Sequence, residues 1–129
     1  KRVKLLCIAG TRPEAIKMAP VIQALHGEPW ADCRVLATAQ HRQMLDQVLR
    51  LFDIAADIDL DIMRPNQALN ALTARLLLDL DAALEAEAPD AVLAQGDTTT
   101  VMTAALACFY RRIPFGHVEA GLRTGDLRN

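Results

Sequence analysis

The chain has 129 residues, the size of one ordinary domain. It carries 14 Lys and Arg against 16 Asp and Glu, and this net charge of −2 argues against nucleic-acid binding and against a polybasic membrane surface. Hydrophobic residues make up 52% of the chain, which is enough for a core and too many for a disordered segment. The longest charge-free run, residues 98–110, is shorter than the about 20 residues that a membrane span needs.

No leader pattern opens the chain, so a cytoplasmic protein is expected. Cys7, Cys33 and Cys108 form no CxxC pair, and two of them lie in apolar stretches. They predict a reduced intracellular protein that uses cysteine as a small hydrophobic residue. Because neither the cysteines nor the three histidines have zinc spacing, no metal is expected.

The first apolar run, residues 3–9, has the pattern of a strand buried on both faces, and Gly10 ends it. A helix is predicted to follow, because Thr11 can cap the free backbone donors and Glu14 can reach back to Thr11. The apolar face predicted for this helix consists of Ile16, Ala19, Ile22 and Leu25.

A second strand and a second helix are predicted at residues 33–38 and 41–52. Beyond them, Asp57, Asp59 and Asp61 alternate with apolar residues, which predicts a half-exposed edge strand with solvated carboxylates. The three aspartates resemble the start of a calcium loop. The glycine and the glutamate that such a loop requires further on are missing.

The rest of the chain continues the alternation of helices and strands. A leucine-striped helix is predicted over residues 66–87, a strand over 91–95, a helix over 98–111 and a strand over 115–119. Strands that alternate with helices pair in parallel through right-handed crossovers. The predicted fold is therefore α/β, a single doubly wound, mainly parallel sheet.

Polar residues gather where the predicted strands end, which is where such sheets bind ligands. The four clusters are Gly10-Thr11-Arg12, Gln40-His41, Gln95-Gly96-Asp97-Thr98 and Glu119-Ala120-Gly121. Few polar residues occur inside the strands. This coincidence is the main argument from the residues for a functional site.

The loop after the first strand has neither the GxGxxG pattern of dinucleotide-binding folds nor a P-loop. Arg12 instead precedes the helix N-terminus, and Lys17 lies in the second helical turn. A helix N-terminus favours anions, and two neighbouring cations suit a phosphate or a diphosphate. The alternative is that Arg12 pairs with Glu14 and that Lys17 is solvated.

Asp97 and Glu119 place two carboxylates at neighbouring strand ends, which suits acid/base chemistry. Asp97 could instead serve as the N-cap of the next helix, whereas Glu119 has no helix nearby to cap. His117 lies on the same side of its strand as Glu119, where a lone histidine is more often a hydrogen-bonded core residue than a catalyst. A structural ion-pair network is the competing account of the two carboxylates.

Four segments resemble motifs of the non-hydrolysing UDP-N-acetylglucosamine 2-epimerases and follow in the same order. They are residues 10–20 (GTRPEAIKMAP), 38–42 (TAQHR), 95–100 (QGDTTT) and 116–126 (GHVEAGLRTGD). The resemblance covers essentially the whole chain. It implies that residues 1–129 are the N-terminal Rossmann-like domain of a glycosyltransferase-B type two-domain fold, and that the C-terminal domain is absent from this chain.

The resemblance also implies an isomerase that interconverts UDP-N-acetylglucosamine and UDP-N-acetylmannosamine for cell-surface polysaccharides, as a homodimer without a redox cofactor. UDP would be eliminated and re-added, with inversion at C2. By motif position, Arg12 and Lys17 contact the substrate diphosphate, and Asp97 and Glu119 bind substrate and supply acid/base catalysis. Since this chain carries half of such a site, the isolated chain is expected to be inactive.

Some bacterial members of that family bind a second UDP-sugar as an activator, and the resemblance places Gln40, His41 and Gln43 there. Asn66 stands about where those members carry an arginine. Two other functions remain open at this point. One is a non-catalytic nucleotide-sugar binding module, and the other is a hydrolysing epimerase or a glycosyltransferase of the same architecture.

Overall fold

The computed structural model describes residues 2–38, 42–60, 68–96 and 98–118, with side chains from residue 45 onward in the second range. Five strands form one sheet in the order β3-β2-β1-β4-β5. They are β1 (Val3–Ala9), β2 (Ala31–Ala37), β3 (Ile58–Asp59), β4 (Ala91–Gln95) and β5 (Phe115–Val118). All neighbouring strands pair in parallel, which confirms the predicted sheet.

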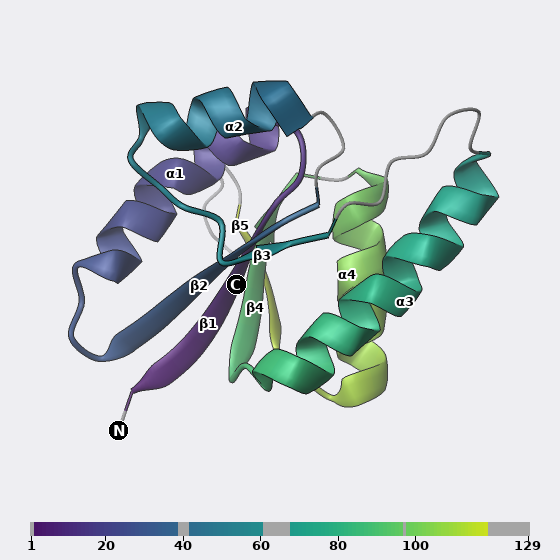
Figure 1. Cartoon of the computed structure of the whole chain (residues 1–129). Coiled ribbons are helices and arrows are strands. Elements are labelled where there is room, and N and C mark those ends of the chain that lie inside the picture. The colour runs from purple at the N-terminus through teal and green to yellow at the C-terminus, as the bar shows by residue number, and fades with distance from the viewer. Residues whose placement is uncertain (1, 39–41, 61–67, 97, 119–129) are drawn as a thin grey trace, which may run out of the picture.

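Four helices cover the sheet: α1 (Arg12–His26), α2 (Arg42–Leu51), α3 (Leu69–Glu87) and α4 (Thr99–Arg111). Helices α1 and α2 lie on one face and α3 and α4 on the other (Figure 1), so each face has its own apolar core. This arrangement confirms the doubly wound, Rossmann-like fold. None of the helices in the described ranges is long and apolar enough to cross a bilayer.

The buried face of α1 agrees with the predicted one at Ala19, Ile22 and the partly buried Leu25, but not at Ile16. Ala15, Met18, Ala19 and Ile22 are buried, whereas Ile16 is 42% exposed. The buried residues follow the spacing i, i+3, i+4, i+7, and Ile16 lies about 100° around the axis from Ala15. Glu14 belongs to the same buried face, although it carries a carboxylate.

The predicted half-exposed edge strand is confirmed as β3, which lies at the edge of the sheet, but among the described residues it is shorter than predicted and spans two residues. Asp57 is also more than a solvated carboxylate, because its Oδ2 accepts a hydrogen bond from the Val35 backbone N–H at 2.8 Å. Its Oδ1 lies 3.6 Å from Arg34 Nη1. The side chain thus satisfies a backbone donor of β2 that a longer β3 would have paired. Asp61 lies outside the described residues.

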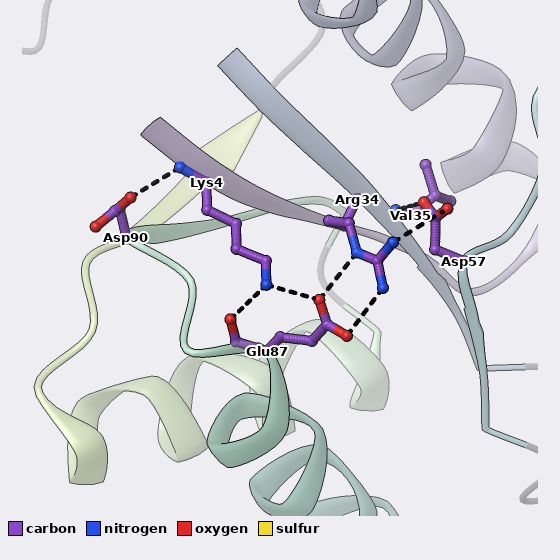
Figure 2. Close-up of polar contacts among 6 residues, drawn as sticks. All are labelled: Lys4, Arg34, Val35, Asp57, Glu87 and Asp90. Carbon is purple, nitrogen blue, oxygen red and sulfur yellow. Dashed lines mark hydrogen bonds and ion pairs between the residues drawn. The ribbon is translucent and has the colours of Figure 1, made fainter. Parts of the chain in front are cut away.

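A charged cluster joins the C-terminal end of α3 to β1 and β2 (Figure 2). Arg34 Nε and Nη2 donate to the two carboxylate oxygens of Glu87 at 2.9 and 3.1 Å. Lys4 Nζ lies 3.2 Å from Glu87 Oε1 and donates to the Glu87 backbone carbonyl at 2.6 Å. Arg34, and then Lys4, hold the pKa of the Glu87 carboxyl below its usual value. This cluster lies away from the carboxyl ends of the strands, so we assign it to stability.

The substitution Glu87→Gln is expected to lower the free energy of unfolding of this chain by about 2 kcal/mol at pH 7, because charge-assisted hydrogen bonds become neutral ones. The folded-state pKa of Glu87 is depressed. Its contribution is therefore complete above the unfolded-state pKa of about 4.3 and is lost as the pH falls through the folded value. Urea unfolding at pH 7 and pH 3 measures this dependence.

The exposed Glu28, which forms no ion pair among the described residues, provides the matched control Glu28→Gln. The control should leave stability unchanged within about 0.5 kcal/mol at both pH values. The loss of unfolding free energy caused by Glu87→Gln should be smaller at pH 3 than at pH 7. An equal loss of unfolding free energy at both pH values would show that the charge of Glu87 does not contribute to stability.

All three cysteines are buried and none forms a disulfide, which confirms their predicted use as hydrophobic residues. The Sγ atoms of Cys7 and Cys33 lie 3.5 Å apart in a hydrogen bond. Burial raises the pKa of the Cys108 thiol to about 11. At pH 8, Cys108 should therefore react with iodoacetamide roughly 100-fold more slowly in the folded chain than in urea, since the thiolate is the nucleophile. Mass spectrometry of the Cys108 peptide measures both rates. Equal rates would contradict the burial of this thiol.

Candidate functional site

The order of the strands places the topological switch point of the sheet between β1 and β4. Strands β2 and β3 are added on one side of β1, and β4 and β5 on the other. At such a switch point the loops leaving the two central strands run to opposite faces of the sheet, and ligands bind at the carboxyl ends. Here the loop after β1 enters α1 and the loop after β4 enters α4. Two of the four polar clusters predicted from the sequence, the ones that follow β1 and β4, therefore begin at this switch point.

Glu14 connects these two loops. It is only 4% exposed, and its Oε1 accepts a hydrogen bond from the Thr11 backbone N–H at 3.0 Å. Its Oε2 accepts a second hydrogen bond, at 2.6 Å, from the hydroxyl of Thr98. The contact with Thr11 confirms the prediction that Glu14 reaches back to the start of α1. The contact with Thr98, 84 positions further along the chain, was not predicted.

Two glycines make room for this carboxylate. A Cβ at Gly10 would lie 2.8 Å from Glu14 Oε1, and a Cβ at Gly96 would lie 3.0 Å from Glu14 Oε2. Gly96 also has a φ of +102°, which side-chain-bearing residues rarely adopt. Both loops therefore approach the Glu14 carboxylate more closely than they could if residue 10 or residue 96 had a side chain.

The loop after β4 is also held from the other side, by β5. Nε2 of His117 forms a hydrogen bond with the backbone carbonyl of Gly96. The prediction that His117 is a hydrogen-bonded residue is confirmed, but its side chain is exposed rather than part of the core. Gly96 thus lies between a carboxylate from α1 and an imidazole from β5.

A third strand end contributes the hydroxyl of Thr38, directly after β2. Thr38 is fully buried, and its Oγ1 has no hydrogen-bond partner among the described residues. A Cβ at Gly10 would lie 3.2 Å from this oxygen. Polar groups therefore occur at the carboxyl ends of β2, β1 and β4 and on β5.

Arg12 and Lys17 are both exposed on α1. Within the described ranges neither forms a hydrogen bond or an ion pair, so the alternative in which Arg12 pairs with Glu14 is wrong. Two unpaired cations near a helix N-terminus can attract an anion. They lie five residues, or about 140°, apart around the helix axis, so the structure does not bring them onto one face.

The other predicted site residues, Gln40, His41, Asp97 and Glu119, and the side chain of Gln43, lie outside what the structure describes. Their neighbours in the chain are placed. Gln95 pairs with Val118 across β4 and β5, so Asp97 and Glu119 follow adjacent strand ends. Among the described residues, no group of three His, Cys, Asp or Glu side chains is placed to hold a metal ion.

Comparisons with known proteins agree with this arrangement. The family model described as UDP-N-acetylglucosamine 2-epimerase matches residues 23–129. The UDP-N-acetylglucosamine 2-epimerases of Yersinia pestis and Escherichia coli K12 are 61% and 58% identical to the chain over 125 residues, which is 97% of this chain and 33% of each relative.

A crystal structure of the UDP-GlcNAc 2-epimerase from Neisseria meningitidis, bound to UDP-GlcNAc, matches the fold with a TM-score of 0.86 at 56% identity. The match covers 95% of this chain and 33% of that one, so this chain spans about a third of the length of its relatives. On the family match and these identities, the chain belongs to the UDP-N-acetylglucosamine 2-epimerase family.

Proposed function

We propose that this chain forms one side of the active site of a longer enzyme that interconverts UDP-N-acetylglucosamine and UDP-N-acetylmannosamine. The observation that carries the proposal is the set of polar groups at the switch point of a chain that is 61% identical to such an epimerase. The remainder of the site would come from the second domain of a glycosyltransferase-B type fold. A crevice between two domains is a common position for a ligand site.

The proposed reaction is an elimination followed by a re-addition. A carboxylate removes the proton at C2 while the C1–O bond to UDP breaks, and a C1=C2 double bond forms in a 2-acetamidoglucal. The diphosphate oxygen then adds back to C1, and a proton is delivered to C2 from the opposite face. The reaction needs acid/base groups and stabilisation of the departing diphosphate, and no redox cofactor.

Asp97 and Glu119 are assigned to binding the sugar and to the proton transfers, and Arg12 and Lys17 to the diphosphate. The pairing of β4 with β5 supports the first assignment, because it brings the two carboxylate-bearing strand ends together. The exposed, unpaired cations of α1 support the second. The segment after β2, with Gln40, His41 and Gln43, is assigned to a second UDP-sugar that acts as an activator.

A cytoplasmic homodimer that serves polysaccharide synthesis completes the proposal. The structure supports the dimer alone, through an exposed apolar stripe on α4. Met102, Leu106 and Phe109 follow the helical spacing i, i+4, i+7, and Phe109 is 75% exposed. Leu78 on the neighbouring helix α3 is exposed as well. A second copy of the protein would cover this surface.

Product analysis on the full-length protein tests the reaction. The protein is incubated with UDP-N-acetylglucosamine, and anion-exchange chromatography separates UDP-linked sugars from free sugars and UDP. We expect a mixture of the two UDP-linked epimers and no free sugar. Free N-acetylmannosamine would indicate the hydrolysing epimerase, transfer to an acceptor a glycosyltransferase, and binding without turnover a non-catalytic module.

A further inference from the structure

We infer that Glu14 is a positioning residue for the proposed epimerase reaction, because its carboxylate fixes the turn between β4 and α4 against the start of α1. The inference rests on the proposed function. It concerns a side chain that forms no hydrogen bond or ion pair with Arg12 or Lys17, the residues assigned to the diphosphate.

The contacts of Glu14 exceed what capping of its own helix requires. A glutamate in the first turn of a helix commonly accepts one hydrogen bond from the N-cap backbone, as Glu14 does from Thr11 at 3.0 Å. The second oxygen bonds at 2.6 Å to the hydroxyl of Thr98, on a helix that covers the opposite face of the sheet. One buried carboxylate therefore connects the two helices that diverge from the switch point.

Thr98 provides independent support, because it is the N-cap residue of α4 and its side chain caps nothing there. Threonine at an N-cap ordinarily accepts a hydrogen bond from its own helix, and loss of a cap costs about 1 kcal/mol. Here the hydroxyl donates to Glu14 instead. Helix α4 therefore lacks the usual capping hydrogen bond, and the Thr98 hydroxyl instead bonds the loop after β4 to Glu14 of α1. This exchange is expected where function requires the turn between β4 and α4 to be held in one position.

The turn that Glu14 fixes contains Asp97, one of the two carboxylates assigned to proton transfer. Gly96, on one side of Asp97, is in close contact with the Glu14 carboxylate and hydrogen-bonds His117. Thr98, on the other side, donates to Glu14. The backbone is therefore held on both flanks of Asp97. Misplacement of a catalytic group by about 1 Å can lower a rate about 10²-fold, so release of either flank should lower kcat.

The substitution Thr98→Val in the full-length enzyme removes the hydroxyl and preserves the shape of the side chain. We expect kcat to fall about 10- to 100-fold with KM changed less than about 3-fold, because the chemistry is misaligned while the substrate contacts remain. Thr98→Ser keeps the hydroxyl and should restore kcat to within about 3-fold of the wild type. The matched control is Thr73→Val on α3, which removes a hydroxyl bonded to its own helix and should leave kcat unchanged.

Glu14→Gln separates positioning from direct catalysis. Glutamine has the same length, its amide oxygen can accept from Thr11, and its NH₂ can donate to a Thr98 hydroxyl turned to accept. A positioning role predicts a kcat within about 10-fold of the wild type. A loss of about 10³-fold in this variant, with melting temperature retained, would overturn the inference in favour of proton transfer by Glu14.

The remaining outcomes are also distinguishable. If Thr98→Val keeps the kcat of the wild type, or raises KM alone, the positioning role is wrong while the proposed function stands. If the wild-type enzyme yields no UDP-linked epimer, the proposed function itself fails, and the positioning role fails with it. Melting temperatures of Thr98→Val and Thr73→Val, compared with their kcat values, show whether lost stability alone explains a lost rate.

Discussion

Replacement of Glu119 by glutamine in the full-length enzyme is expected to lower kcat by at least about 10³-fold. Glutamine has nearly the same shape but cannot accept or donate the proton at C2, and removal of a general acid or base costs about 10²- to 10⁴-fold in rate. Because Glu119 directly follows β5 at the carboxyl edge of the sheet, the fold should tolerate the change. Turnover of UDP-N-acetylglucosamine and the melting temperature together measure the effect.

Glu28→Gln is the matched control for this experiment, since Glu28 is exposed in the turn after α1, away from the strand ends that form the site. It should leave both kcat and the melting temperature unchanged. A near-normal rate in the Glu119→Gln enzyme would assign Glu119 a structural role. The two proposed proton transfers would then have to involve Asp97 and groups outside this chain.

The second large effect concerns the 129-residue chain by itself, which is expected to show no epimerase turnover. The chain supplies the ends of β1, β4 and β5, and the remaining contacts to the sugar and the uridine would come from the second domain. A nucleotide-sugar that is bound by this chain alone stays exposed to solvent, because no second domain covers it. Its C2 proton would then lack the enclosed, oriented environment that the elimination needs.

The comparison uses equal molar amounts of the isolated chain and the full-length enzyme, with circular dichroism to verify that the chain is folded. The folded chain should remain at the background rate while the full-length enzyme turns over. Measurable interconversion by the folded chain would contradict the division of the site between two domains.

The fold could be predicted in most respects, because buried parallel strands have a distinctive sequence pattern. Residues 3–9 were predicted as a strand and form β1 with those bounds, and residues 91–95 form β4. The failures occurred where a side chain replaced a backbone pairing or where the helical phase was ambiguous. Asp57 satisfies the donor of Val35, so β3 begins only at Ile58, and Ile16 fits an apolar stripe one position away from the one that packs.

The site could be predicted less completely. The rule that ligands bind at strand ends correctly located the polar groups around the switch point, since parallel strands all present their carboxyl ends at one edge. The link between Glu14 and Thr98 could not be predicted, because capping explains Glu14 locally and nothing in the sequence indicates a partner 84 positions away. The contact of His117 with Gly96 depends likewise on the register of β4 against β5.

The most direct test of the central claim is proton NMR of UDP-N-acetylglucosamine incubated with the full-length enzyme in D₂O. Removal and return of the C2 proton predict that UDP-N-acetylmannosamine accumulates and that both UDP-linked epimers carry deuterium at C2. Free N-acetylmannosamine, or a UDP-linked product that retains the original hydrogen at C2, would contradict the proposed elimination and re-addition.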